Sequence, residues 1–557
     1  MTRSTTSVGI RQSPRPEAGL HPHYVALFWL NSESGEAAAD RLTARGAREA
    51  RGFEPVLRAP GLLILGDTTD PRGQVRRQGG RILIGERFER AGCREHAEAP
   101  GGWCPNIWGA FVSFEHRPDG SVQIVRDPSG GQHLYLTQKQ DLLVASNAFP
   151  SWLREALNLD IRCDLHQLAA ALADPLRLTY ASPLTGICVV PAGCTCEWRD
   201  AQLGPVTLAW RPHALRGQRS GMDIADASAR LRSAVIESCR AFATRHDRLA
   251  IEVSGGLDSA IVLGAIASAP NAPEITCVHF HVEHSGGDER DHARAVAERW
   301  GVRLVEVGAK ASDFRFEDAL QEEQPLEPVI FGLDPLVEGA SLGVGHAVDA
   351  TAILTGQGGD AVFLNSPSPW TAVDRARAQR LATFASRVPL ETALRAGTTI
   401  WHIYRLLLTD MVRSRREAPA YLPGGHLTRF ALEARLRTEH PWLEHLAALP
   451  PGRRDQLRAI ANCQHFNSPT ARGAFAPLIH PLLSQPVTET CLTIPTWMLA
   501  HGTINRALAR QTFADWLPAG LRLHGLPPVR SEEFEGPPPI VANIVRVDHP
   551  RGRNWCS

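Results

Sequence analysis

The chain has 557 residues, more than a single hydrophobic core usually serves, so we expect at least two domains. Lysine plus arginine and aspartate plus glutamate each number 59, and this balance gives no argument for nucleic acid or a membrane as a partner. A hydrophobic content of 43% with 21% charged residues is typical of a soluble globular protein, and no window reaches the roughly 18 consecutive apolar residues of a membrane span.

Cysteine and histidine clusters are the first candidates for metal ligands. The eleven cysteines follow no repeated framework, which favours reduced thiols and a cytoplasmic location. Cys194 and Cys196 would be half of a metal site only with a second pair, and none follows, so we interpret them as two residues on one face of a strand. We interpret His279, His281 and His284 as structural or substrate-facing and not as metal ligands.

The first half of the chain begins with a polar stretch, residues 1–22, that we interpret as a flexible arm. From residue 23 to about residue 210, short apolar runs are separated by Gly, Pro and Asp, which is typical of layered antiparallel sheets with some helical cover. The runs expected to form strands are 24–30, 62–65, 82–84, 108–114, 122–125 and 142–145. The composition then turns to Arg, Pro, Gly and Ser, which predicts a linker at 211–224, followed by a helix at 225–243.

An apolar, β-branched run at 249–253 ends at Ser254, Gly255 and Gly256 and continues as an apolar stretch from residue 257, which predicts a strand, a tight turn and a helix. Backbone N–H groups at a helix N-terminus bind anions, and glycines let the backbone approach the anion closely. Asp258 would repel a bare phosphate, so it indicates a Mg²⁺ ion between carboxylate and phosphate oxygens. The turn is not a P-loop, because it lacks the Gly-x-x-x-x-Gly-Lys-[Ser/Thr] pattern, and an ordinary turn is the alternative interpretation.

Strand, helix and strand alternate after this turn. Strands are expected at 274–282 and 302–307, with a helix between them that opens at Asp288 and runs to Gly301. This rhythm predicts a parallel sheet, which binds ligands at the carboxyl ends of its strands. Residues 370–450 are rich in Arg, Ala and Leu at helical spacing and predict a helical layer.

The stretch 352–360, Ala-Ile-Leu-Thr-Gly-Gln-Gly-Gly-Asp, repeats the pattern of an apolar strand, a glycine turn and an aspartate. Each turn alone is consistent with an ordinary connection. Two of them in one α/β domain would face each other at a sheet edge and hold one nucleotide. We therefore expect Asp258 and Asp360 to share a Mg²⁺ ion.

Two stretches resemble the ATP pyrophosphatases, the group that includes asparagine synthetase. Residues 254–259 (Ser-Gly-Gly-Leu-Asp-Ser) are similar to the pyrophosphate-binding loop of that family, and residues 355–360 (Thr-Gly-Gln-Gly-Gly-Asp) to its second loop. The resemblance implies ATP and Mg²⁺ as cofactors, with Asp258 and Asp360 as catalytic residues and metal ligands. Gln357 replaces a glutamate common in asparagine synthetases, so any acid–base role of that glutamate is not carried over. The nucleotide-binding residues that the resemblance implies are Ser254, Gly255, Gly256, Leu257, Asp258, Ser259, Thr355, Gly356, Gly358 and Gly359.

The first half resembles the glutamine-amidotransferase domain of asparagine synthetase. The matching stretches, in order and spacing, are 108–112, 126–130, 134–135 and 145–147. The family domain begins with a cysteine whose thiol attacks glutamine. Here Thr2 follows Met1 and the first cysteine is Cys93, so we expect a retained scaffold that does not hydrolyse glutamine. The attacking amine must then come from another source.

The C-terminal part resembles the lasso-peptide macrocyclases, relatives of asparagine synthetase that close a peptide's N-terminal amine onto an Asp or Glu side chain. The matching stretches are 481–489, 494–495, 505–510 and 516–518. The resemblance implies adenylation of that side chain and macrolactam formation, with AMP and pyrophosphate released. It also implies a precursor peptide as substrate, and a leader peptidase and a leader-recognition protein as partners. A β-lactam synthetase-like cyclisation of a small amino acid is the alternative enzyme interpretation.

One family position differs in a way that bears on catalysis. The family carries a lysine in an Arg-x-Lys-x-x-Phe segment, where its ammonium stabilises the charge of the leaving pyrophosphate or AMP. The matching stretch, 529–534, has Ser531 at that position, and the last lysine of the chain is Lys310. Arg530 is our candidate for the positive charge, although a guanidinium would not act as a proton-accepting base. The missing lysine motivates a third interpretation, a nucleotide- or peptide-binding scaffold without catalysis.

These observations predict an α/β and α+β protein of two domains. An amidotransferase-like (Ntn-type) β-sandwich with helices is expected at 23–210, and an asparagine-synthetase-like ATP-dependent domain with a parallel sheet at 225–536. Residues 537–557 are expected to form a Pro-rich tail without helical periodicity. We expect a cytoplasmic enzyme without a nucleic-acid or membrane partner.

Overall fold

The computed structural model describes the chain between residues 22 and 523, with gaps. The arm expected at 1–22 lies outside the described residues except for Pro22, which is buried, and the tail at 537–557 lies outside them entirely. The described residues are 22–30, 32–49, 53–78, 80–90, 106–173, 182–215, 222–282, 288–309, 326, 335–365, 367–412 and 440–523.

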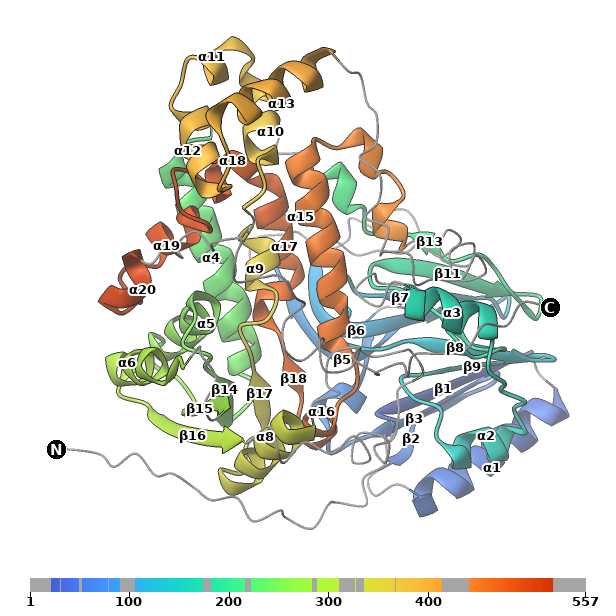
Figure 1. Cartoon of the computed structure of the whole chain (residues 1–557). Coiled ribbons are helices and arrows are strands. Elements are labelled where there is room, and N and C mark those ends of the chain that lie inside the picture. The colour runs from blue at the N-terminus through green and yellow to red at the C-terminus, as the bar shows by residue number, and fades with distance from the viewer. Residues whose placement is uncertain are drawn as a thin grey trace, which may run out of the picture.

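Two antiparallel sheets form the first half of the molecule and lie to the right in Figure 1. The strands of the first sheet are β1 (Tyr24–Trp29), β2 (Phe53–Ala59), β3 (Leu62–Asp67), β8 (Tyr135–Lys139), β9 (Leu142–Ser146) and β10 (Cys188–Val189). Those of the second are β4 (Val75–Gln78), β5 (Arg81–Glu89), β6 (Ile107–His116), β7 (Val122–Arg126), β11 (Cys194–Arg199), β12 (Gln202–Leu203) and β13 (Thr207–Leu208). The strand orders are β10-β8-β9-β1-β3-β2 and β12-β11-β7-β6-β5-β4, with β13 paired to β11. The predicted antiparallel pairing is confirmed.

Strand β1 is buried on both faces because its side chains alternate between two apolar clusters. Ala26 and Phe28 pack into the core between the two sheets. Val25 and Leu27 belong to a second cluster, to which helices α1 and α2 also contribute. The first half therefore has two sheets with helical cover on the first sheet. Its helices are α1 (Glu33–Glu49), α2 (Ser151–Leu157) and α3 (Leu165–Ala173).

A five-stranded sheet, with parallel pairs in the order β16-β15-β14-β17-β18, organises the second half, as predicted. Its elements are β14 (Arg248–Glu252), β15 (Glu274–Val282), β16 (Arg303–Ala309), β17 (Ala352–Leu354), β18 (Leu478–Ile479), α4 (Ile224–Ala243), α5 (Leu257–Ala267), α6 (Arg290–Trp300) and α8 (Pro335–Ala347). Leu249 and Ile251 of β14 share an apolar cluster with α4 and α5, whereas Ala250 clusters with Val344 of α8. A sheet covered on both faces is typical of a doubly wound α/β arrangement.

Local sequence explains where the helices around this sheet begin and end. Helix α4 begins after Asp223, whose carboxylate accepts a hydrogen bond from the Asp226 N–H at 2.7 Å. Helix α6 ends at Trp300 because Gly301 takes a left-handed conformation with a φ of 63°. Helix α5 is apolar on nearly every side and is almost entirely buried, so it is a central helix of this half.

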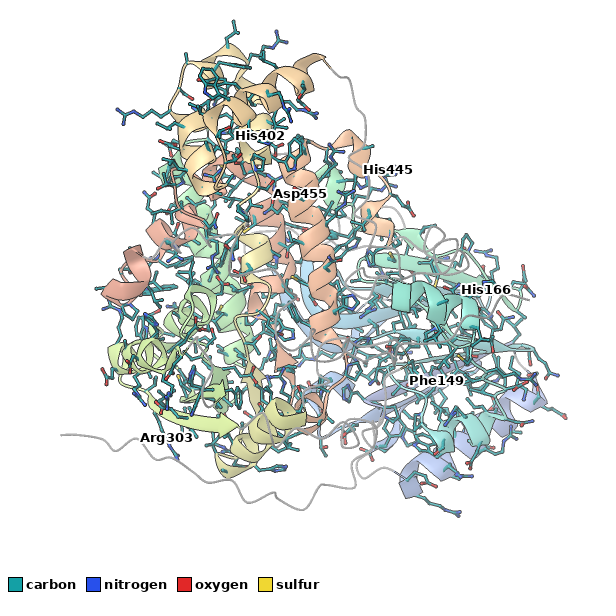
Figure 2. All side chains as sticks on the ribbon, in the orientation of Figure 1. Phe149, His166, Arg303, His402, His445 and Asp455 are labelled. Atoms are coloured by element: carbon teal, nitrogen blue, oxygen red, sulfur yellow. The ribbon has the colours of Figure 1, made fainter. Side chains whose placement is uncertain are left out.

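Helices α10 to α13 lie at the top of the molecule in Figure 1, within the helical layer expected at 370–450. Residues 413–439 of that layer lie outside the described residues. Figure 2 shows His402 of α13 and Arg303 of β16 at opposite ends of the molecule in this view. No helix in the described ranges is long and apolar enough to cross a membrane. The α-helices after α8 are α9 (Gly359–Val362), α10 (Trp370–Gln379), α11 (Leu381–Phe384), α12 (Val388–Arg395), α13 (Ile400–Val412), α15 (Pro451–Asn462), α16 (Ala471–Phe475), α17 (Gln485–Thr493), α18 (Thr496–Leu499), α19 (Ala507–Thr512) and α20 (Ala519–Leu523).

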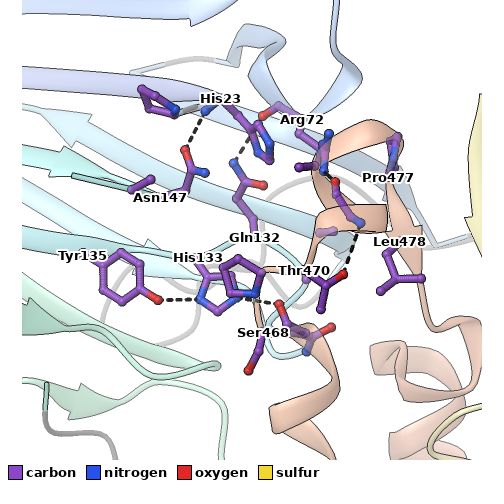
Figure 3. A pocket seen from close by; sticks show the side chains of 18 of the residues that line it. His23, Arg72, Gln132, His133, Tyr135, Asn147, Ser468, Thr470, Pro477 and Leu478 are labelled. Atoms are coloured by element: carbon purple, nitrogen blue, oxygen red, sulfur yellow. Dashed lines mark hydrogen bonds between the residues drawn. The ribbon is translucent and has the colours of Figure 1, made fainter. Parts of the chain in front are cut away.

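The two halves are joined by hydrogen bonds and by a shared apolar cluster. Trp442 Nε1 donates to the Ala192 carbonyl oxygen at 2.8 Å, and His133 Nε2 donates to the Asn467 carbonyl oxygen at 2.7 Å. Trp108 of β6 belongs to the cluster that forms the core around α4 and α5. A cavity of about 460 Å³ lies between the halves and is lined by residues of both (Figure 3).

Candidate nucleotide-binding site

The first glycine loop connects β14 to α5, as predicted. Gly255 has a φ of +87°, and a Cβ there would lie 2.8 Å from the Glu289 carbonyl oxygen, so only glycine fits without strain. The Ser254 hydroxyl accepts a hydrogen bond from the Gly256 N–H at 3.2 Å, and the Ser259 hydroxyl donates to the Gly256 carbonyl oxygen at 3.3 Å. Within the described residues no side chain caps the N-terminus of α5, which leaves its first N–H groups open to an anion.

The second glycine loop follows β17 and packs against the first turn of α5. The two strands that lead into the loops are neighbours in the sheet, with Ile251 opposite Leu354. A Cβ at Gly356 would lie 2.4 Å from the Ser259 nitrogen, so a larger residue there would displace one of the two loops. The prediction that the two turns face each other is therefore confirmed.

Thr355 and His480 hold the second loop in place. The Thr355 hydroxyl accepts a hydrogen bond from the Gln357 N–H at 3.1 Å and donates to His480 Nδ1, 2.7 Å away. His480 Nε2 donates to the Phe466 carbonyl oxygen at 2.9 Å, because a carbonyl oxygen only accepts. Burial lowers the pKa of His480 to about 4, so the ring is neutral and its tautomer is set by these two bonds. No short sequence motif around His480 pointed to this contact.

Arg506 lies between the two predicted aspartates, a contact that the sequence did not predict. Its Nη1 atom is 2.9 Å from Asp258 Oδ2 and 2.5 Å from Asp360 Oδ1. Arg506 directly precedes α19 and has a φ of 55°, in the left-handed region. The exposed side-chain fraction is 14% for Asp258, 65% for Asp360 and 12% for Arg506. The two carboxylates therefore converge on one nitrogen at a place that solvent reaches from the Asp360 side.

Burial dominates the electrostatics of Asp258. It raises the pKa of this carboxyl to about 7, with the Arg506 guanidinium lowering it and the Asp360 carboxylate raising it. Asp258 Oδ1 is buried and has no hydrogen-bond partner. A carboxylate in this position needs a nearby cation to be charged at neutral pH.

Asp258 and Asp360 are suited to bind a Mg²⁺ ion. Both supply carboxylate oxygens, and both carboxylates point to the same place, the Arg506 Nη1 atom. Mg²⁺ is commonly held by one or two carboxylates together with phosphate oxygens of a substrate. Among the residues that the structure describes, no three His, Cys, Asp or Glu side chains gather into a metal site. The two aspartates would therefore hold the ion together with the phosphates of a nucleotide.

The predicted nucleotide-binding residues lie in the two loops and in the first turns of α5 and α9. The structure thus brings both predicted stretches together, while their contact with a nucleotide stays a prediction. Gln357 is half-buried beside them. Arg530 and Ser531 lie outside the described residues, so the role of Arg530 stays a prediction.

His279 supports the backbone that enters the first loop. It is 3% exposed, and its Nδ1 donates to the Val253 carbonyl oxygen at 2.7 Å. The ring of His281 stacks on it, with centroids 6.2 Å apart. This contact supports the structural interpretation of His279 over the substrate-facing one. His284 lies outside the described residues.

Cys194 and Cys196 face the sandwich core from β11, which confirms the interpretation of same-face strand residues. Burial raises the pKa of the Cys194 thiol to about 12, so it is an unreactive core residue. The cysteines in the described part of the chain are free thiols.

The cavity between the halves has both polar and apolar walls and no cysteine among its described lining residues (Figure 3). Asn147 Oδ1 accepts a hydrogen bond from the His23 N–H at 2.7 Å, at the start of β1. Arg72 is paired with Asp70, with 2.5 Å between Nη2 and Oδ2. The described wall therefore offers no thiol for attack on glutamine.

Glycine loops that meet at neighbouring strand ends, with an uncapped helix N-terminus and two aspartates, define an α/β protein with a candidate nucleotide-binding site. Residues 230–523, more than half of the chain, match the family model described as asparagine synthase. The chain belongs to the asparagine synthase family. Membership supports an ATP-dependent, amide-forming activity.

No curated protein matches the chain. Among solved structures, the chain is similar to the U34-tRNA thiolase NcsA from Methanococcus maripaludis with its [4Fe-4S] cluster, with 11% sequence identity and a TM-score of 0.20. The match covers 42% of this chain and 80% of the thiolase chain. The allosteric regulatory enzyme of purine biosynthesis is 10% identical, with 51% and 80% covered and a TM-score of 0.20. Glutamine phosphoribosylpyrophosphate amidotransferase from B. subtilis, complexed with ADP and GMP, is 10% identical, with 50% and 65% covered and a TM-score of 0.19.

Proposed function

We propose that the protein is an ATP-dependent lasso-peptide cyclase, which joins the N-terminal amine of a core peptide to an Asp or Glu side chain as a macrolactam. One observation carries the proposal: the two glycine loops meet at Asp258 and Asp360, in a chain whose interdomain cavity has no cysteine among its described lining residues. Such a site suits activation of a carboxylate by ATP. The amine then has to come from the substrate.

The first step is adenylation. A carboxylate oxygen of the peptide attacks the α-phosphorus of ATP, the bond from that phosphorus to pyrophosphate breaks, and pyrophosphate leaves with the electron pair. The open N–H groups of α5 and of the second loop would hold the phosphates. A Mg²⁺ ion held by Asp258 and Asp360 would reduce the negative charge of the phosphates.

The second step closes the ring. The N-terminal amine attacks the acyl carbon, AMP leaves with the oxygen that joined it to the acyl group, and the nitrogen releases a proton to water. Amine and acyl adenylate belong to one folded peptide, so proximity favours ring closure over hydrolysis. A leader peptidase and a leader-recognition protein would deliver the peptide with its amine free.

The test uses the purified full-length protein with Mg²⁺, ATP and a leader-free core peptide that begins with Gly or Cys and carries an acidic residue several positions later. We expect pyrophosphate release and a product one water lighter than the peptide. The matched control is the same peptide with alanine at the acidic position, which should neither release pyrophosphate nor lose water. An Asp258→Ala enzyme should be inactive with both peptides.

Two other outcomes would replace the proposal. Pyrophosphate release with a small amino-acid substrate, and none with peptides, would favour the β-lactam synthetase-like cyclisation. Nucleotide binding without pyrophosphate release would favour a catalytically impaired nucleotide- or peptide-binding scaffold, which Ser531 at the lysine position motivates.

A further inference from the structure

Arg506 has a strained backbone conformation and a buried side-chain donor that is unpaired. Its backbone lies in the left-handed region (φ 55°, ψ 34°), which residues other than glycine adopt rarely. One nitrogen, Nη1, contacts both carboxylates, while Nε is buried and has no hydrogen-bond partner. A guanidinium with an unused buried donor is positioned for a further acceptor that the protein itself does not supply.

The aspartates that bind Arg506 are also the two residues that fit Mg²⁺. A guanidinium and a divalent cation would compete for the same oxygen atoms and would repel each other across a short distance. When a nucleotide brings Mg²⁺ to Asp258 and Asp360, the guanidinium has to leave them. The negative groups nearest to it are then the phosphate oxygens, which a guanidinium binds well through its planar set of N–H donors.

The geometry points to Arg506 as a mobile counter-ion that neutralises Asp258 and Asp360 in the nucleotide-free enzyme and binds the pyrophosphate group once nucleotide and Mg²⁺ are in place. This inference rests on the proposed function for its reaction, in which the departing pyrophosphate carries negative charge. Arg506 provides the positive charge at a site that has no lysine within the described residues. It gains and loses no proton, since a guanidinium stays protonated.

The test is the affinity of the purified full-length protein for inorganic pyrophosphate with Mg²⁺, measured by calorimetry without any peptide. We expect Arg506→Gln to weaken this binding by about 10- to 100-fold, the effect of losing hydrogen bonds to a charged group. Arg506→Lys keeps the charge but not the fork of donors, so it should weaken binding by less than about tenfold. The matched control is Arg232→Gln, which breaks an Arg–Asp pair of 2.7 Å between Arg232 and Asp515 and should bind pyrophosphate as the wild type does.

Whether Arg506→Gln weakens or strengthens pyrophosphate binding decides between the inference and its alternative. Unchanged or tighter pyrophosphate binding by Arg506→Gln would overturn it, because a guanidinium that only competes with Mg²⁺ weakens binding in the wild type. Circular dichroism shows whether each variant is folded. If Arg506→Gln does not fold, Arg506→Lys decides: weaker binding supports the inference, and equal or tighter binding overturns it. A wild-type protein that binds neither ATP nor pyrophosphate would overturn both this inference and the proposed function, whereas unchanged variants would overturn this inference alone.

Discussion

Gly359 lies so close to Asp258 that a Cβ at Gly359 would stand 2.3 Å from the Asp258 Cγ atom. The two residues come from different loops and are 101 positions apart in the chain. The position of the Asp258 carboxylate therefore depends on the absence of a side chain at 359. The contact also explains why the second loop needs glycine at position 359.

Replacing Gly359 by alanine should displace Asp258 and weaken the binding of ATP with Mg²⁺ by roughly 5- to 150-fold. Overpacking of this kind costs about 1 to 3 kcal/mol, which corresponds to roughly 5- to 150-fold in affinity. Calorimetry with a non-hydrolysable ATP analogue measures the change. Gly339→Ala is the control, because a Cβ at Gly339 in α8 would meet nothing within 4 Å. Equal affinities for both variants would contradict the packing described for the two loops.

His480 should contribute to nucleotide binding through Thr355. His480→Ala removes the acceptor of the Thr355 O–H group and leaves this buried donor unpaired, at a cost of about 1 to 3 kcal/mol of folding free energy. We expect weaker ATP binding as well, because the second loop loses its anchor. Thr355→Val should have a similar effect, and the double variant should cost about as much as either single change. Additive losses in denaturant unfolding and in affinity would show that the two residues act separately.

The stability of the protein should fall as pH rises through the range in which Glu338 loses its proton. Glu338 of α8 is 1% exposed, and burial raises its pKa from 4.5 to about 7, against the lowering effect of Arg472. A carboxyl group whose pKa is higher in the folded state stabilises that state. This stabilisation is complete at pH values below the pKa in the unfolded chain, and it is lost as pH rises through about 7. The free energy of unfolding of Glu338→Gln, relative to that of the wild type, should therefore be about 1 to 3 kcal/mol higher at pH 8 than at pH 5.

Urea unfolding at the two pH values measures this difference. The control is Glu298→Gln on α6, because Glu298 is exposed. Its stability relative to the wild type should be the same at both pH values. A Glu338→Gln variant that behaves like this control would mean that Glu338 is ionised in the folded protein throughout the range.

Asp258→Asn should abolish the binding of ATP with Mg²⁺ without lowering the thermal stability of the protein. Because burial raises the pKa of Asp258 to about 7, its favourable contribution to folding is present below the unfolded pKa and lost as pH rises through about 7. At pH 8 the charged carboxylate costs stability, so the asparagine variant should melt no lower than the wild type. Its affinity for ATP with Mg²⁺ should fall below detection, because one metal ligand is gone. A variant that melts several degrees lower would show that Asp258 mainly holds the fold together.

The fold could be predicted where the information is local. The apolar run before Ser254 and the apolar stretch after Gly256 predict strand, turn and helix because strand and helix have distinct side-chain periods. Alternating strands and helices then predict a parallel sheet, and the second loop at 355–360 could be recognised as a repeat of the first. Figure 1 shows the resulting arrangement of β14, β17 and α5.

The contacts that complete the site could not be predicted, because they join residues far apart in sequence. Arg506 reaches Asp258 across 248 positions and Asp360 across 146, and His480 reaches Thr355 across 125. The stretch 505–510 resembles the lasso-peptide macrocyclases, but that resemblance assigned no role to Arg506. Only the packing of α19 beside α4 and α18 places its guanidinium at the two loops.

The most direct test of the central claim follows oxygen from the peptide to the nucleotide. A core peptide whose acidic side chain carries ¹⁸O in its carboxylate is incubated with the full-length protein, ATP and Mg²⁺, and the nucleotide products are analysed by mass spectrometry. Adenylation predicts AMP that contains one ¹⁸O atom, together with a cyclised peptide that has lost one. The label in inorganic phosphate with ADP as product, or unlabelled AMP, would contradict attack of the carboxylate on the α-phosphorus.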